Sequence, residues 1–139
     1  MTEGFNKVFI DTAPLVYIVE NINDFADPAE NKIIQLSTNS IFITSVITYT
    51  EFCIIPERTN NQQLIKEFGE LLTILNCDIK NIDITIAKAT SKLRAKYQSL
   101  RTPDALQLAT AIHHNCNKFL TNDKKLKQVS EIEVVLITD

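Results

Sequence analysis

The sequence predicts an α/β protein built on a parallel sheet. Short apolar runs of strand length alternate along the chain with segments whose apolar residues recur at helical spacing. Helices between successive strands imply right-handed crossovers, which make the strands parallel and cover both faces of the sheet. With 139 residues, 45% hydrophobic and 22% charged, the chain can bury the core of a single soluble domain spanning residues 1–139.

The first half of the chain predicts two strands and three helices. An apolar run ends in Asp11, and Asp11 or Thr12 can cap the next helix, with Pro14 in its first turn. Ser45 has the character of an N-cap and opens a helix that we expect Pro56 to end. In chain order the elements are a strand at 7–11, a helix from about 12, a helix after Pro28, a strand at 40–44 and a helix from about 46.

The second half continues the alternation. Leucine and phenylalanine at helical spacing predict an amphipathic helix over 60–75. Asp83 is expected to cap a long helix, and Thr102 with Pro103 to start the next. The remaining strands are predicted at 79–82, 118–121 and 134–137.

Composition excludes several classes of protein. Only two glycines occur, and neither the dinucleotide-binding nor the P-loop glycine motif is present. No apolar run approaches the length of a membrane span, and the opening residues lack the pattern of a signal peptide. Three cysteines without a paired spacing indicate free thiols, so we expect a cytoplasmic protein.

The net charge of −3 conceals a basic segment. Residues 84–103 contain five basic residues and no acidic one. Lys92, Lys96 and Arg101 in this segment are candidate contacts to the phosphates of a nucleic acid, although a solvated helix face explains the lysines equally well.

Four carboxylates carry the functional prediction. Asp11 follows the first strand, Glu51 lies in the helix after the second, and Asp123 follows the fourth. Parallel strands place their carboxyl ends along one edge, and Asp104 needs only its helix to begin there. Each acid alone has an ordinary structural explanation, such as a helix cap or a favourable position on the helix dipole. Gathered together they would repel one another unless Mg²⁺ or Mn²⁺ neutralised them, which predicts a metal-dependent hydrolase acting on phosphate.

Four segments resemble the PIN-domain ribonucleases, and among these the VapC-type toxins of bacterial toxin–antitoxin pairs. They are 8–13 (VFIDTA), 44–52 (TSVITYTEF), 101–111 (RTPDALQLATA) and 119–123 (FLTND). The resemblance extends from about Lys7 to Ile137. One departure is Ala13, where many relatives carry serine.

The resemblance implies a five-stranded parallel sheet in a three-layer α/β/α sandwich and cleavage of RNA by metal-activated water. It assigns metal binding to Asp11, Glu51, Asp104 and Asp123, and assigns Thr121 and Asn122 to orienting water or metal. It also implies an RNA substrate, a cognate antitoxin and a homodimer.

Two alternatives stay open at this point. A receiver domain also places acids at strand ends, but it would need an acidic pair after the first strand and a lysine after the fifth. A PIN fold kept only for binding RNA or protein is the other, because a fold does not fix a function.

Overall fold

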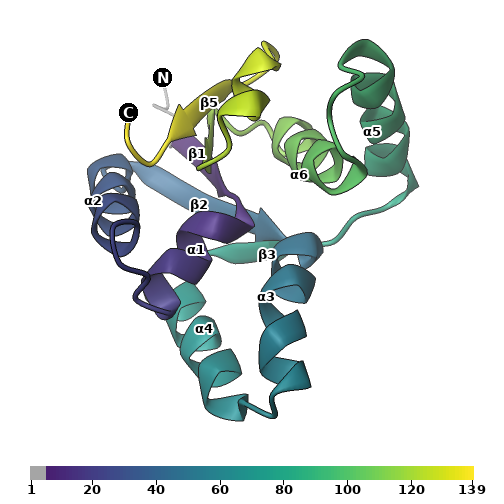
Figure 1. Cartoon of the computed structure of the whole chain (residues 1–139). Helices are drawn as coiled ribbons and strands as arrows, with labels where there is room; N and C mark the ends of the chain where they lie inside the picture. The colour runs from purple at the N-terminus through teal and green to yellow at the C-terminus, as the bar shows by residue number, and fades with distance from the viewer. Residues whose placement is uncertain (1–5) are drawn as a thin grey trace.

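The computed structural model describes residues 6–139, which contain a five-stranded sheet with every neighbouring strand pair parallel (Figure 1). The spatial order is β3-β2-β1-β4-β5, which places β1 at the centre. This confirms the predicted sheet. It also excludes a receiver domain, whose strands follow the order 2-1-3-4-5. The strands are β1 (Asn6–Ile10), β2 (Ser40–Ser45), β3 (Asp78–Lys80), β4 (Lys118–Thr121) and β5 (Glu133–Leu136).

Helices cover both faces of the sheet, as a parallel sheet requires. One apolar cluster joins α1, α2, α3 and α4 to one face, and a second joins α5, α6 and η1 to the other. This confirms the three-layer α/β/α architecture. The helices are α1 (Thr12–Val19), α2 (Ala26–Leu36), α3 (Val46–Arg58), α4 (Gln62–Ile74), α5 (Ile84–Lys96), α6 (Thr102–His113) and the 3-10 helix η1 (Lys124–Gln128).

Successive side chains of a strand point to opposite faces of the sheet and so contribute to two separate apolar cores. In β1, Phe9 belongs to the cluster under α5 and α6, whereas Val8 and Ile10 belong to the opposite cluster. The ring of Phe9 stacks on Phe119, its register partner in β4, with centroids 5.1 Å apart. Burying such a side chain contributes roughly 1.5–3 kcal/mol.

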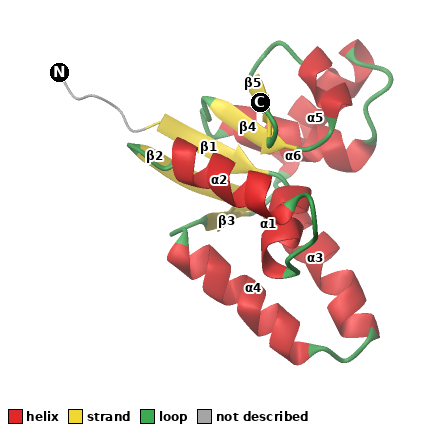
Figure 2. Ribbon diagram, turned by 60° about the vertical axis from the view of Figure 1, so that its left-hand side comes forward, coloured by secondary structure: helices red, strands yellow, loops and turns green. Residues whose placement is uncertain are grey.

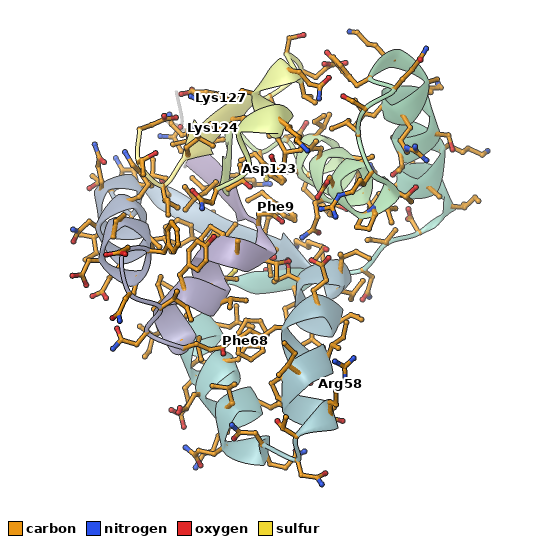
Figure 3. The ribbon with its side chains drawn as sticks, in the orientation of Figure 1. Phe9, Arg58, Phe68, Asp123, Lys124 and Lys127 are labelled. Atoms are coloured by element: carbon orange, nitrogen blue, oxygen red, sulfur yellow. The ribbon has the colours of Figure 1, made fainter. Side chains whose placement is uncertain are left out.

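The helices α3 and α4 form a pair that extends away from the sheet (Figure 2). Their contact is made by Phe52 and Phe68, whose rings stack with centroids 4.1 Å apart. Figure 3 shows Phe68 between these two helices, far from Phe9. The pair therefore has its own apolar seam, which is continuous with the core beside α1.

Asparagine ends four of the helices. Asn21, Asn60, Asn76 and Asn115 have φ between 49° and 59°, in the left-handed region. At Asn115 the backbone N–H bonds the carbonyl of Ile112, and the following residue completes the hydrogen-bond pattern of a Schellman cap. Asparagine tolerates this conformation better than other non-glycine residues. A chain with two glycines can therefore still end its helices sharply.

Two predicted helix boundaries are wrong. The second helix begins at Ala26, so Pro28 lies in its first turn, where a missing N–H costs nothing. Pro56 does not end α3, which continues to Arg58. A proline this close to the helix end removes one hydrogen bond only, and the left-handed Asn60 sets the true end.

Between residues 6 and 139, none of the helices has both the length and the apolar character needed to cross a bilayer.

Candidate functional site

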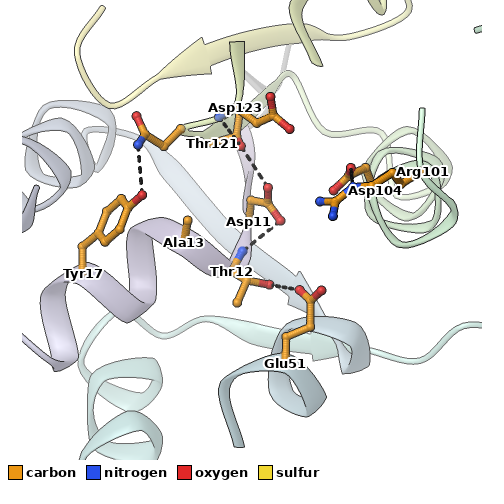
Figure 4. A pocket seen from close by; sticks show the side chains of 10 residues that line it. Asp11, Thr12, Ala13, Tyr17, Glu51, Arg101, Asp104, Thr121 and Asp123 are labelled. Carbon is orange, nitrogen blue, oxygen red and sulfur yellow. Dashed lines mark hydrogen bonds and ion pairs between the residues drawn. The ribbon is translucent and has the colours of Figure 1, made fainter. Parts of the chain in front are cut away.

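The four predicted acids line one pocket at the carboxyl ends of the central strands (Figure 4). The pocket has a volume of ≈ 440 Å³. Thr121 and Asn122, the two predicted polar residues, line it as well. The structure therefore brings together segments that are separated by more than a hundred positions along the chain. The acids are Asp11, Glu51, Asp104 and Asp123.

Local structure explains how each acid reaches this edge. Asp11 leaves β1 and is the N-cap of α1, where its side chain accepts from the backbone N–H of Thr12 at 2.9 Å. Asp123 follows β4 and caps η1 in the same way. Glu51 lies in the second turn of α3, and Asp104 in the first turn of α6. Asp11, Glu51 and Asp123 lie just before or within helices that follow β1, β2 and β4, as expected for a parallel sheet, and Asp104 lies at the start of a helix that begins beside the same edge.

The half-buried carboxylate of Asp11 is the centre of the site. Its Oδ2 accepts from the hydroxyl of Thr121 at 2.9 Å, and its Oδ1 accepts from Gln107 Nε2 at 3.3 Å. Burial raises the pKa of Asp11 to about 6, against the lowering effect of its hydrogen bonds to Thr12, Thr121 and Gln107. The negative charge of Asp104 raises it further. A negative charge at Asp11 is therefore costly until a cation balances it.

Gln107 is a site residue that the sequence did not reveal. It is fully buried in α6, and its Nε2 also donates to Thr48 Oγ1 at 2.6 Å. Its Oε1 accepts from the hydroxyl of Ser45, the N-cap of α3. The available sequence signal was that Gln107 is a lone amide on an apolar helix face. A buried amide needs polar partners, so such a residue indicates a polar contact within the core. Its partners lie 59 to 96 positions away and could not be identified from the sequence.

Glu51 and Asp104 are held at the rim by single contacts. The hydroxyl of Thr12 donates to Glu51 Oε1 at 2.5 Å. Asp104 pairs with Arg101, whose Nε lies 3.1 Å from Asp104 Oδ2. The hydrogen bond and charge of Asp104, followed by the charges of Asp123 and Glu51, raise the pKa of Arg101. The guanidinium of Arg101 thus supplies positive charge within the acidic pocket.

The donor set fits a hard divalent cation chemically, because it offers several carboxylates and a threonine hydroxyl around one cavity. As the side chains stand, however, residues 6–139 include no group of three acidic, histidine or cysteine side chains placed to hold a metal ion. In these contacts Asp104 engages Arg101 through Oδ2 and Glu51 engages Thr12 through Oε1, which leaves the second oxygen of each carboxylate for an ion.

Thr121 and Asn122 position their neighbours. The Thr121 hydroxyl donates to Asp11 and accepts from the backbone N–H of Asp123 at 3.1 Å, so it links two acids of the pocket. Asn122 Nδ2 donates to the hydroxyl of Tyr17 at 2.9 Å (Figure 4). Tyr17 and Ala13, which are one turn apart in α1, both line the pocket.

The three predicted phosphate contacts separate into two places. Arg101 lines the acid pocket. Lys92 and Lys96 instead line a different, mainly apolar cavity between α5 and α6. Lys96 is paired there with Glu131 at 3.2 Å.

Several solved structures share this fold. A chain of VapBC2 from Rickettsia felis, bound to a promoter DNA fragment, matches with a TM-score of 0.77 and 18% identity over 94% of this chain and 98% of its own. VapBC-1 from nontypeable Haemophilus influenzae matches with a TM-score of 0.76 and 17% identity over 96% of this chain and 99% of its own. VapC20 from Mycobacterium tuberculosis, a sarcin-ricin loop cleaving toxin, matches with a TM-score of 0.70 and 13% identity over 91% of this chain and 98% of its own. At these identities the likeness establishes the fold alone.

The sequence itself gives a more specific assignment. No curated protein sequence matches this chain. The family model of the PIN domain, in contrast, matches residues 8–132. Because this match spans nearly the whole sequence, including all four acids of the pocket, the chain belongs to the PIN domain family.

Proposed function

We propose that this protein is a Mg²⁺- or Mn²⁺-dependent endoribonuclease and the toxin of a toxin–antitoxin pair. The observation that carries the proposal is the convergence of Asp11, Glu51, Asp104 and Asp123 on one pocket. Four carboxylates from four separate segments have no structural need to share a cavity, since each already has its own helix or hydrogen bond. A divalent cation that binds a phosphodiester gives this arrangement a purpose.

Each residue has a definite part in the proposed chemistry. A bound divalent ion would lower the pKa of its water and stabilise the charge that develops on the phosphate. Asp11, fixed by Thr121 and Gln107, would be the anchoring ligand, and Asp104 and Glu51 would complete the shell. Asp123 and Asn122 would orient water at the pocket rim, while Thr121 keeps Asp11 and Asp123 in place.

The structural neighbours support the biological role. Several are chains from VapBC complexes, and one is named as a toxin that cleaves the sarcin-ricin loop. By the same relationship we propose an RNA substrate, an antitoxin partner and a homodimer of single-domain chains in the cytoplasm.

A binding module without catalysis is the second candidate function. The observation that favours it is that, within residues 6–139, no three acidic, histidine or cysteine side chains lie close enough together as they stand to hold a metal ion. Failure to bind Mn²⁺ would exclude the nuclease, since a nuclease of this kind must take up the ion and a pure binding module need not. Titration calorimetry with Mn²⁺ on the wild-type protein and Asp11→Asn measures this directly.

RNA cleavage by the purified, partner-free protein tests the proposed function. The substrates are a panel of structured RNAs, with Mg²⁺ or Mn²⁺, with EDTA, and with Asp11→Asn. We expect cleavage with metal, and none with EDTA or with the variant. Equal cleavage by Asp11→Asn would identify a contaminating nuclease and remove Asp11 from the site. Metal binding without cleavage of any RNA would favour the binding module.

A further inference from the structure

A second cavity of ≈ 310 Å³ adjoins the acid pocket. It lies between the loop that precedes α6 and the start of η1. Arg101, Asp104 and Asp123 line both cavities, so the two are neighbouring parts of one depression. Ser99 and Lys125 line only the second.

The second cavity differs from the first in its charge. The acid pocket presents four carboxylates and one cation, whereas the second cavity presents two carboxylates and two cations. Lys125 is exposed and has no ion-pair partner among the residues that the structure describes. Arg101, with a side chain that is 77% exposed, is paired with Asp104 alone. Once a divalent ion engaged the shared acids, the positive charge of both side chains would be left to act on another anion.

Hydrogen bonds fix the walls of this cavity. Arg94 donates from Nε to the carbonyl of Leu100 at 2.9 Å and from its guanidinium to Thr102 at 3.0 Å, which holds the loop before α6. Gln128 Nε2 donates to the Ser99 hydroxyl at 3.0 Å and ties that loop to η1.

The backbone that carries Lys125 is fixed as well. Its N–H donates to Asp123 Oδ1 at 3.0 Å, and its carbonyl accepts from Gln128 Nε2 at 2.9 Å. Asp123, which borders the proposed metal site, therefore also fixes the backbone position of Lys125. A cation on a preorganised backbone loses less entropy when it binds a ligand than one on a mobile loop.

We propose that this second cavity is a phosphate subsite, in which Lys125 and Arg101 bind a backbone phosphate of the RNA strand next to the bond that is cut. The proposal rests on the nuclease function proposed above. An RNA strand that places one phosphate in the acid pocket must continue past the rim of that pocket. The second cavity adjoins the acid pocket and shares three of its lining residues, so the next phosphate of the RNA would lie there. Lysine binds phosphate as a point charge without base preference, so the subsite holds the strand and carries no sequence information.

The salt dependence of RNA binding tests the subsite. The probe is a short fluorescent single-stranded RNA of mixed sequence. Each protein is titrated into this RNA in the presence of Mg²⁺, and the titration is repeated over a range of salt concentrations. All proteins carry Asp11→Asn, so that the RNA stays intact. A lost phosphate contact should reduce the slope of log K against log salt by about 0.7 for a single strand. We expect this reduction for Lys125→Gln, whose side chain has no ion-pair partner among the described residues and therefore does not depend on a bound metal ion to be available.

Lys124→Gln is the matched control. Lys124 is the adjacent residue, is also exposed and lines neither cavity, and its change to glutamine removes the same single charge. We expect its slope to equal that of the parent protein. Equal reductions for Lys124→Gln and Lys125→Gln would show that only the general surface charge matters and would overturn the subsite. No reduction for Lys125→Gln would overturn it as well.

Cleavage by proteins with the natural Asp11 separates this inference from the function on which it rests. If the wild-type protein cuts RNA and Lys125→Gln binds and cuts equally well, the subsite fails and the nuclease stands. If the wild-type protein neither binds nor cuts any RNA of the panel, the nuclease itself fails, and the subsite with it.

Discussion

Replacing Asp11 with asparagine should increase the free energy of unfolding of the metal-free protein near neutral pH. Burial raises the pKa of Asp11 from 3.8 to about 6 in the folded chain. In the folded state the proton is therefore bound more tightly than in the unfolded state. As pH rises from 3.8 to about 6, the unfolded chain loses this proton first, and the folded state is destabilised over that window.

The size of the effect follows from the same two values. The pKa values of Asp11 in the unfolded and folded chain differ by roughly 2.2. Each whole pKa unit corresponds to ~1.36 kcal/mol, so the charge on Asp11 costs the folded state about 3 kcal/mol. An asparagine keeps the acceptor for Thr12 but disturbs the hydrogen bond from Thr121, at about 1 kcal/mol. We therefore expect Asp11→Asn to be more stable than the wild-type protein by about 2 kcal/mol near neutral pH.

Urea unfolding in EDTA provides the measurement, at acidic and at neutral pH. The difference in stability between variant and wild type should be largest at neutral pH and should shrink as pH falls through the window from about 6 to 3.8. Glu70→Gln, at an exposed position of α4, is the control and should show little change. A variant that is less stable than the wild-type protein at neutral pH would refute the reasoning, because Asp11 would then contribute to stability as a charge.

Three further predictions concern the site and the helix ends. Mn²⁺ at a hundred times its dissociation constant should add about 2.7 kcal/mol to the unfolding free energy of the wild-type protein and much less to Asp11→Asn, as measured by thermal shift; equal gains would place the metal elsewhere. Gln107→Ala should cost about 2–3 kcal/mol in urea unfolding, because it leaves the buried Ser45 and Thr48 without their amide partner; a loss under about 0.5 kcal/mol would show that water replaces it. Asn115→Gly should leave stability unchanged or higher, whereas Asn115→Ala should lower it by about 1 kcal/mol, since alanine has no local hydrogen bond to offset the left-handed φ of 59°. Equal stability of these two variants would contradict the assigned helix cap.

The sequence predicted the elements of the fold well, because each one leaves a local pattern. All five strands and six long helices lie where apolar periodicity and capping residues indicated. The meeting of Asp11, Glu51 and Asp123 at one edge was also predictable, since it follows from parallel strands, whereas Asp104 joins them only because α6 begins there. The helix boundaries predicted at Pro28 and Pro56 are wrong, because a proline is tolerated in the first turn of a helix and near its end.

Cross-chain contacts were not predictable in the same way. Gln107 reaches Asp11 across 96 positions, and nothing local to either residue indicates that they meet. The separation of Arg101 from Lys92 and Lys96 has the same origin. All three belong to one basic segment in the sequence, but the turn between α5 and α6 carries Arg101 to the acid pocket and leaves both lysines on the helix.

The contacts around the acids indicate the order in which a divalent ion would engage them in the proposed metal site. Asp11 accepts three hydrogen bonds, two of them from the buried side chains of Thr121 and Gln107, so its position is fixed before any ion arrives. Asp104 is held by a largely exposed arginine, and ion pairs of that kind contribute little and weaken with salt. The site therefore combines one carboxylate fixed by three hydrogen bonds, Asp11, with Asp104 and Glu51, which are each held by a single contact. In the proposed site Asp11 would therefore hold the ion first and Asp104 after it, and Arg101 would then be available to the phosphate of the proposed neighbouring subsite.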